Sequence, residues 1–266
     1  MFADLAVSLA VLVGVVALSD GTRRALWRIF AGTSVRAYAG ELVSTFQLCC
    51  CTHELRLLSE MGVVPAGVSL TLTYLAAVTH GLTFRGATGN PIGTVEHAYR
   101  ARISGKDAML KISCQFVAAE GARAAVQVIW GRGLSVLHTR HTLSGFWCAS
   151  AIRAPLHMAA CVEFACAFAV QTAVTHTRAL EEKYRVHAIA AVITSVVYAG
   201  GSTTGAVFNP ALAFSTLFGC TGSSLLEYCV VYWMGPLLGM TFSVLLFDKL
   251  SSQVSSQSPL DTMKRK

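Results

Sequence analysis

Long apolar segments separated by short polar ones dominate this chain. They cover approximately residues 2–19, 37–58, 66–84, 108–130, 156–177, 187–201 and 225–248. A helix rises 1.5 Å per residue, so most of these segments are long enough to cross a hydrocarbon core of roughly 30 Å. The pattern predicts an all-α membrane protein.

Two copies of one dipeptide, Asn90-Pro91 and Asn209-Pro210, lie 119 residues apart, and each opens a short apolar segment. Asn is a preferred N-cap and Pro suits the first helical position, so each pair is expected to begin a helix. Helices over 90–100 and 209–218 would measure about 16 and 15 Å, half of what a crossing needs. We therefore predict two half-helices that enter from opposite faces, with their N-termini meeting near the midplane.

An internal repeat surrounds these pairs. Glu41 precedes Asn90 by 49 residues, and Glu163 precedes Asn209 by 46. Each half contains three full crossings, an odd number, so the second half is expected to be inverted relative to the first, a plan known from transport proteins. A carboxylate inside a span is costly unless paired. We expect Glu41 and Glu163 to accept N–H groups of the adjacent re-entrant loops; a role in a proton relay is the alternative.

Charge is sparse and unevenly distributed. Charged residues make up 13% of the chain against 54% hydrophobic residues, and the net charge of +7 forms no aromatic-interleaved patch for nucleic acid. With the loop before residue 37 placed inside, sixteen of the 21 Lys and Arg residues lie on the inner side and four on the outer side, with Arg123 within a span. The positive-inside rule then predicts a cytoplasmic C-terminus. The first segment, 2–19, reads as an extra peripheral helix or as an amphipathic segment on the membrane surface.

Several polar residues within or beside the spans have two readings each. The nine cysteines lack a CxxC pair and are expected to be free, buried thiols, with Cys220 the one most exposed to oxidation or intersubunit effects. His80 either faces a pore entrance or is a hydrogen-bonded packing residue. Glu120 and Arg123 share a helix face, where they neutralise each other or mark a subunit contact. No metal site, cofactor or enzyme motif is indicated.

The paired half-helices predict the chemistry of a channel. If the Asn oxygens cap the helices, the NH₂ groups are left facing the lumen, where they donate to passing water or hydroxyl oxygens. Both helix N-termini project partial positive charge to the same point, which opposes cations. Backbone carbonyls of 85–89 and 200–208 are expected to form a ladder of acceptors.

These motifs resemble the aquaporin, or major intrinsic protein, family over roughly residues 36–248. The resemblance rests on Asn209-Pro210-Ala211, the degenerate Asn90-Pro91-Ile92, the paired glutamates and Tyr232-Trp233-Met234-Gly235-Pro236. The segments 45–55, 198–202 and 204–212 are similar to the divergent superaquaporin branch. The resemblance implies one channel domain, an aquaporin-like right-handed bundle of six transmembrane helices from two inverted repeats plus two half-helices. Its expected parts are an N-terminal helix and basic loop over 1–35, repeats over 36–131 and 154–248, and a tail over 249–266. It further implies a homotetramer, with water, glycerol and hydrogen peroxide as permeants. The implied location is chiefly the endoplasmic reticulum membrane, with the plasma membrane or vesicles as alternatives.

The chain departs from the common family pattern at the expected constrictions. The third residue of the first motif is Ile92, whose branched side chain would narrow or dry the lumen, and Leu212 stands where an Arg is usual. The other outer-filter positions fall near Leu70, Val197 and Ala206, so this filter is expected to be wide and apolar. A closed, scaffold-like channel remains the alternative, whereas a secondary transporter would need unbalanced acids at the midplane.

Overall fold

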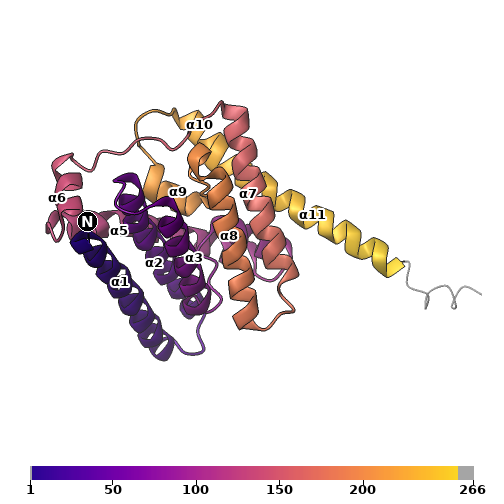
Figure 1. Ribbon diagram of the computed structural model, residues 1–266. Helices are drawn as coiled ribbons and strands as arrows, with labels where there is room; N and C mark the ends of the chain where they lie inside the picture. The colour runs from indigo at the N-terminus through magenta and orange to yellow at the C-terminus, as the bar shows by residue number, and fades with distance from the viewer. Residues whose placement is uncertain (1, 257–266) are drawn as a thin grey trace, which may run out of the picture.

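The computed structural model describes residues 2–256, with side chains described through residue 249, and is drawn in Figure 1. Within this range the chain is helical, and its elements are α1 (Phe2–Ile29), α2 (Val35–Glu60), α3 (Ala66–Thr83), α4 (Pro91–Tyr99), α5 (Gly105–Gly131), α6 (Val136–Leu143), α7 (Leu156–His176), α8 (Glu182–Thr204), α9 (Pro210–Leu217), α10 (Leu225–Cys229), the π-helix η1 (Val230–Met234) and α11 (Gly235–Ser256). The all-α prediction is confirmed. Residues 249–256 of the predicted tail continue α11, and the rest of that tail, 257–266, lies outside the described residues.

The two halves of the chain build matching units. In the first half α2 packs against α5, and in the second half α7 packs against α11. The short helices α4 and α9 lie among these long ones, and the pair α3 and α8 joins the halves. This is the predicted aquaporin-like bundle of six long helices and two half-helices.

Small residues allow α7 and α11 to pack closely against each other. A Cβ atom added at Gly239 would lie 2.2 Å from the carbonyl oxygen of Phe164, and one at Gly235 would lie 2.9 Å from that of Ala160. A side chain at either position would therefore collide with backbone. Glycines four residues apart are a common solution for close helix packing in membranes.

The N-terminal segment forms a 28-residue helix, α1, that packs along α2 outside the repeat. Its length of about 42 Å is sufficient for a crossing. A buried arginine of α1 connects this helix to α2. Arg23 is 1% exposed and donates to Oε1 of Gln47 (2.6 Å) and Oγ of Ser44 (3.4 Å), both on α2. The reading of 2–19 as an extra helix is confirmed.

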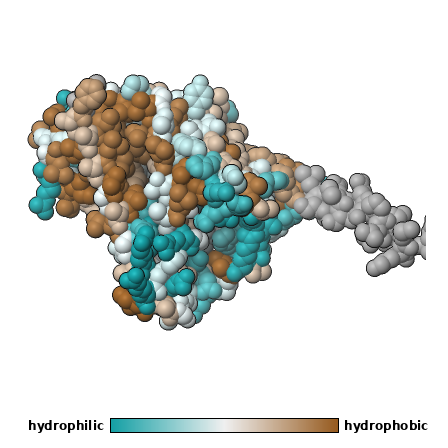
Figure 2. Space-filling view, turned by 60° about the horizontal axis from the view of Figure 1, so that its bottom comes forward, coloured by the Kyte–Doolittle hydropathy of each residue, from teal (hydrophilic) through white to brown (hydrophobic). Residues whose placement is uncertain are grey.

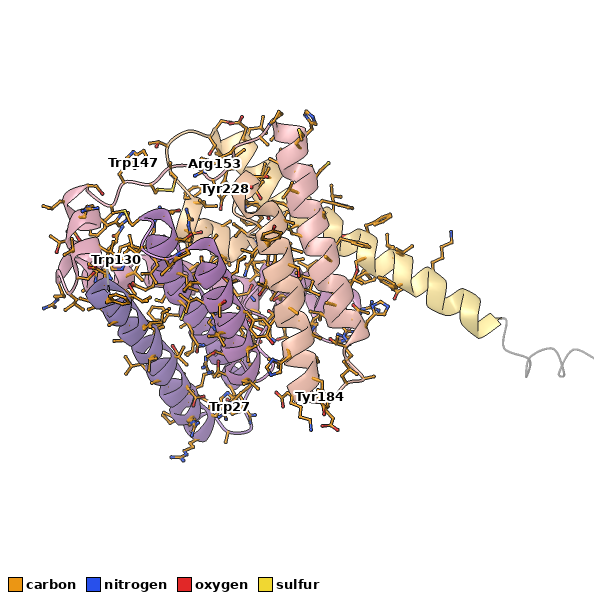
Figure 3. All side chains as sticks on the ribbon, in the orientation of Figure 1. Trp27, Trp130, Trp147, Arg153, Tyr184 and Tyr228 are labelled. Carbon is orange, nitrogen blue, oxygen red and sulfur yellow. A yellow bond between two sulfur atoms is a disulfide. The ribbon has the colours of Figure 1, made fainter. Side chains whose placement is uncertain are left out.

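The sides of the bundle are apolar, as a lipid-facing surface requires. By length and apolar composition, α1, α7, α8 and the segment Leu225–Lys249 are candidate membrane spans. Figure 2 shows apolar atoms gathered over one side of the bundle and polar atoms nearer the end turned toward the viewer. Exposed aromatic residues lie near both ends, with Trp147 at the upper end and Tyr184 at the lower end in Figure 3. Trp and Tyr are enriched at membrane–water boundaries.

Three features of the fold differ from the sequence-based expectations. The helix α6 was not predicted, and the last span begins as α10 and passes through a π-helical turn just before Pro236. A π-turn accommodates a proline, which lacks the backbone N–H that a regular helix uses. The free-thiol expectation is wrong for Cys148 and Cys220, which form a disulfide across 72 residues of sequence. The other seven cysteines are free, and Cys49, Cys50, Cys51 and Cys166 are buried as expected, whereas Cys114 is half-buried and Cys161 and Cys229 are exposed.

Candidate functional site

The two Asn-Pro pairs begin the half-helices α4 and α9. Oδ1 of Asn90 accepts the N–H of Ile92 (3.0 Å), and Oδ1 of Asn209 accepts the N–H groups of Ala211 (3.1 Å) and Leu212 (3.2 Å). Each Asn has extended backbone angles, and each Pro occupies the first helical position. With nine and eight residues, these helices are too short to cross a membrane.

The side-chain amide of each capping asparagine also bonds the loop that precedes the other asparagine. Nδ2 of Asn90 donates to the carbonyl of Phe208 (3.1 Å), and Nδ2 of Asn209 donates to the carbonyl of Gly89 (2.9 Å). Each asparagine therefore bonds the residue that precedes the other asparagine. These are the only two asparagines in the 266-residue chain. The half-helices meet end to end, with their N-termini at one point.

This reciprocal pairing changes the expected donor pattern. A side-chain amide has two N–H donors, and here one of them is used by the opposite loop. One donor per asparagine is left, rather than the free NH₂ group expected from the sequence. The expected carbonyl ladder is also shorter, because α8 continues through Gly200 and Gly201 to Thr204, so that only 205–208 is irregular.

Buried carboxylates support both re-entrant loops. Glu41, which is 0% exposed, accepts the backbone N–H groups of Thr88 (3.0 Å) and Gly89 (3.0 Å). Lys111 and Gln115 of α5 also reach it, at 3.4 and 3.0 Å. The lysine compensates the charge of this carboxylate inside the bundle.

Glu163 plays the corresponding part in the second half. It is 0% exposed and accepts the hydroxyl of Thr204 (2.6 Å) and the N–H groups of Val207 (3.0 Å) and Phe208 (2.6 Å). Phe208 has a positive φ of 38°, a strained backbone angle for a residue with a side chain. It is held there from both sides, because its N–H bonds Glu163 and its carbonyl bonds Asn90.

The other expected site residues fall in several environments. Ile92 is 7% exposed and packs in a small cluster with Met240 and Val244 of α11. Pro91, Pro210 and Ala211 are buried at the junction of the half-helices. At the expected outer filter, Ala206 is 3% exposed and Leu212 packs against apolar residues of both halves. Leu70 and Val197 are partly buried on the facing helices α3 and α8.

Two other expectations about polar residues can be compared with contacts. His80 is buried and bonds Nε2 of Gln47 through Nδ1 (3.0 Å), so the packing reading is confirmed. Arg123 does not pair with Glu120 within the described chain; its Nη2 donates to the carbonyl of Phe218 (2.6 Å), just beyond α9. The carbonyl end of a helix attracts cations, and sequence spacing alone could not reveal this partner.

An ion cluster that the sequence did not reveal holds the far end of α4. The carboxylate of Glu96, which is 2% exposed, contacts Arg100, Arg102 and Arg178. Arg178 comes from the loop after α7, and Arg100 also pairs with Asp248 of α11 (3.0 Å). The first half-helix is thus tied to the second half of the chain at both of its ends.

Comparisons with known proteins agree with this geometry. A human protein named aquaporin-11 is 37% identical over 245 residues, which cover 92% of this chain and 90% of that protein. The chain belongs to the aquaporin family. A mouse aquaporin-12 is 36% identical over 248 residues, covering 92% of this chain and 86% of its own. No family model matches the chain.

A solved structure supports the fold independently. An aquaglyceroporin from Plasmodium falciparum superposes with a TM-score of 0.69 over 85% of this chain and 100% of its own. Its sequence is 14% identical, so the likeness is one of fold alone. Family and fold together show an integral membrane protein of the channel type for water or small solutes.

Proposed function

We propose that this aquaporin is a passive channel for water and small neutral solutes, including glycerol and hydrogen peroxide. The observation that supports it is the reciprocal pairing of the two half-helix caps, Asn90 to Phe208 and Asn209 to Gly89. The residues Asn90, Pro91, Ile92, Asn209, Pro210 and Ala211 form the constriction in this proposal. The remaining N–H of each Asn donates to the oxygen of a permeating molecule, and the two positive helix ends oppose cations.

The outer filter in this proposal consists of Leu70, Val197, Ala206 and Leu212. All four side chains are apolar, and none offers the charged donors of an arginine. Such a filter discriminates weakly between water and molecules with an apolar carbon skeleton, such as glycerol. Glycerol and peroxide are therefore expected to permeate beside water.

The proposed orientation places the end of α1, the start of α2 and the loop between α7 and α8 in the cytoplasm. The basic residues gather on that side, as the positive-inside rule requires. The Cys148–Cys220 disulfide then lies on the opposite side. Structural disulfides persist in oxidising compartments, of which the lumen of the endoplasmic reticulum is one, and this fits the proposed location.

The proposed assembly is a homotetramer of single-domain subunits, each with its own pore. The proposed domain comprises an extra N-terminal helix and basic loop over 1–35, repeats over 36–131 and 154–248, and a cytoplasmic tail over 249–266. Apolar side chains exposed along α3, α7 and α11, such as Leu75, Met158 and Phe242, supply surface for lipid or for a neighbouring subunit.

Stopped-flow light scattering of proteoliposomes tests the proposed function. Reconstituted protein is expected to speed osmotic shrinkage and glycerol entry over empty liposomes. Asn209→Asp is expected to weaken both, because it removes the donor to the Gly89 carbonyl and adds a negative charge at the constriction. Folded protein with no acceleration would instead support a scaffold with a closed pore.

A further inference from the structure

A small cavity lies outside the permeation site, between the ends of α2 and α5, the helix α6 and the carbonyl end of α9. Its volume is about 70 Å³, enough for a few water-sized molecules. Its polar lining includes the side chains of His53, Arg56, Arg123 and His141. None of these side chains takes part in the constriction proposed above.

Positive charge predominates in this cavity. Arg56 bonds the carboxylate of Glu60 (2.6 Å) and the carbonyl of Thr216 (3.1 Å), so its charge is partly compensated. Arg123 has no carboxylate partner within the described residues, and its one hydrogen bond goes to the Phe218 carbonyl (2.6 Å). Two arginines against one glutamate give a local excess of one positive charge.

The same lining has donors without acceptors. An arginine carries five N–H donors, and in the described chain the Nε and Nη1 groups of Arg123 have no protein partner. His141, from α6, has neither ring nitrogen bonded there. Burial lowers the pKa of the His141 imidazole, so at neutral pH this ring is uncharged and offers one N–H donor.

We infer that this cavity binds a small monovalent anion of the size of chloride, beside the carbonyl end of the second half-helix. Arg123 supplies the main charge, and Arg56 and His141 complete the donor set. Arg56 and Arg123 already bond the carbonyls of Thr216 and Phe218 at the C-terminal end of α9. The anion therefore contacts the two guanidinium groups and not these carbonyl oxygens. The inference goes beyond the proposed permeation function, and the site can bind an anion whether or not the pore conducts.

Trp130 provides a local reporter. It lines the cavity, its ring meets that of His141 edge-on with centroids 4.9 Å apart, and Figure 3 shows it on the side of the bundle near α6. The other three tryptophans, Trp27, Trp147 and Trp233, do not line the cavity. Replacing those three by Phe in the full chain leaves the Trp130 emission as the signal.

The test is a chloride titration of this protein in lipid nanodiscs, with gluconate replacing chloride at constant ionic strength. We expect a saturable change in Trp130 emission. Arg123→Gln is expected to weaken binding about tenfold or more, because it removes a charged hydrogen bond. Arg132→Gln, at an exposed arginine that does not line the cavity, is the matched control and is expected to leave binding unchanged.

A second variant guards against loss of folding. Glu60→Gln removes the compensating carboxylate at the rim, where Glu60 is 56% exposed, and is expected to tighten chloride binding several-fold. A misfolded protein would not bind more tightly. A linear or absent chloride response, an equal response to gluconate, or unchanged binding in Arg123→Gln would show that the cavity holds only water and would overturn the inference.

Discussion

The carboxylate of Glu163 offers a sharp test of how the second re-entrant loop is held. Glu163→Gln keeps the shape of the side chain but replaces one acceptor oxygen by an NH₂ group. In the native protein both oxygens accept N–H or O–H groups, from Thr204, Val207 and Phe208. The substitution therefore loses a charge-assisted bond and leaves one backbone N–H facing another donor.

The size of the effect follows from these contacts. A hydrogen bond to a charged group contributes about 1.5–3 kcal/mol, and a buried unsatisfied donor costs about 1–3 kcal/mol. The free energy of unfolding should fall by about 2.5–6 kcal/mol, which corresponds to a loss in Tm of roughly 5–25 °C for a chain of this size. Water permeability per folded channel should fall too, because Phe208 presents its carbonyl to Asn90.

Thermal unfolding of the purified protein measures the change in Tm. Stopped-flow light scattering of proteoliposomes that contain folded protein measures the change in water permeability per channel. Glu120→Gln is the matched control, since Glu120 is an exposed carboxylate on α5. If Glu163→Gln unfolds at the same temperature as the control and conducts equally, the loop does not depend on this carboxylate and the reasoning is refuted.

Three further predictions concern the packing that supports the site. Gly239→Ala places a Cβ atom 2.2 Å from the Phe164 carbonyl and should cost about 3 kcal/mol or more in stability, whereas Gly121→Ala, with nothing within 4 Å, should be neutral or slightly stabilising; thermal unfolding distinguishes them. Cys148→Ser, Cys220→Ser and the double variant should each lose about 2–4 kcal/mol. A reducing agent should lower the Tm of the wild type alone, and additive losses would contradict the disulfide. Arg23→Met should lower stability by about 1–3 kcal/mol, because the buried Oε1 of Gln47 loses its donor. The side chain of Arg24 is 63% exposed, so Arg24→Met should lower stability by less than about 1 kcal/mol. Equal losses of stability in Arg23→Met and Arg24→Met would argue against docking of α1 through Arg23.

Much of the fold was predictable because membrane helices carry strong local signals. The half-helices were expected over 90–100 and 209–218 and are observed as Pro91–Tyr99 and Pro210–Leu217. Capping and hydrophobic length are properties of neighbouring residues, so a sequence reveals them directly. The extra helix α1 was found in the same way, although it continues ten residues beyond the apolar segment.

The remaining features depend on residues distant in sequence. The Asn90–Phe208 bond spans 118 residues, and the Cys148–Cys220 disulfide spans 72. Nothing near Cys148 indicates its partner, and an odd number of cysteines allows many pairings. Arg123 was read against Glu120, its neighbour on the helix, whereas tertiary packing brings it to Phe218. Sequence spacing predicts contacts within an element better than contacts between elements.

The side-chain amide of each half-helix cap bonds the loop before the other half-helix, and solid-state NMR can measure this contact in the membrane. The chain has only two asparagines, so labelling their side-chain amides with ¹⁵N gives only two signals. With ¹³C in the phenylalanine carbonyls, a rotational-echo experiment in lipid measures how strongly a nearby carbonyl carbon dephases each ¹⁵N signal. The Asn90 amide is assigned with an Asn209→Gln variant. With an N···O distance of 3.1 Å, its nitrogen should lie about 4 Å from the Phe208 carbonyl carbon and dephase strongly.

In a Phe208→Leu variant the backbone carbonyl of residue 208 remains but carries no ¹³C label, so that dephasing should be abolished. Strong dephasing of the Asn90 amide is expected in the parent protein and none in Phe208→Leu. An Asn90 amide that does not dephase in the folded parent protein would contradict it, because the half-helices would then not meet.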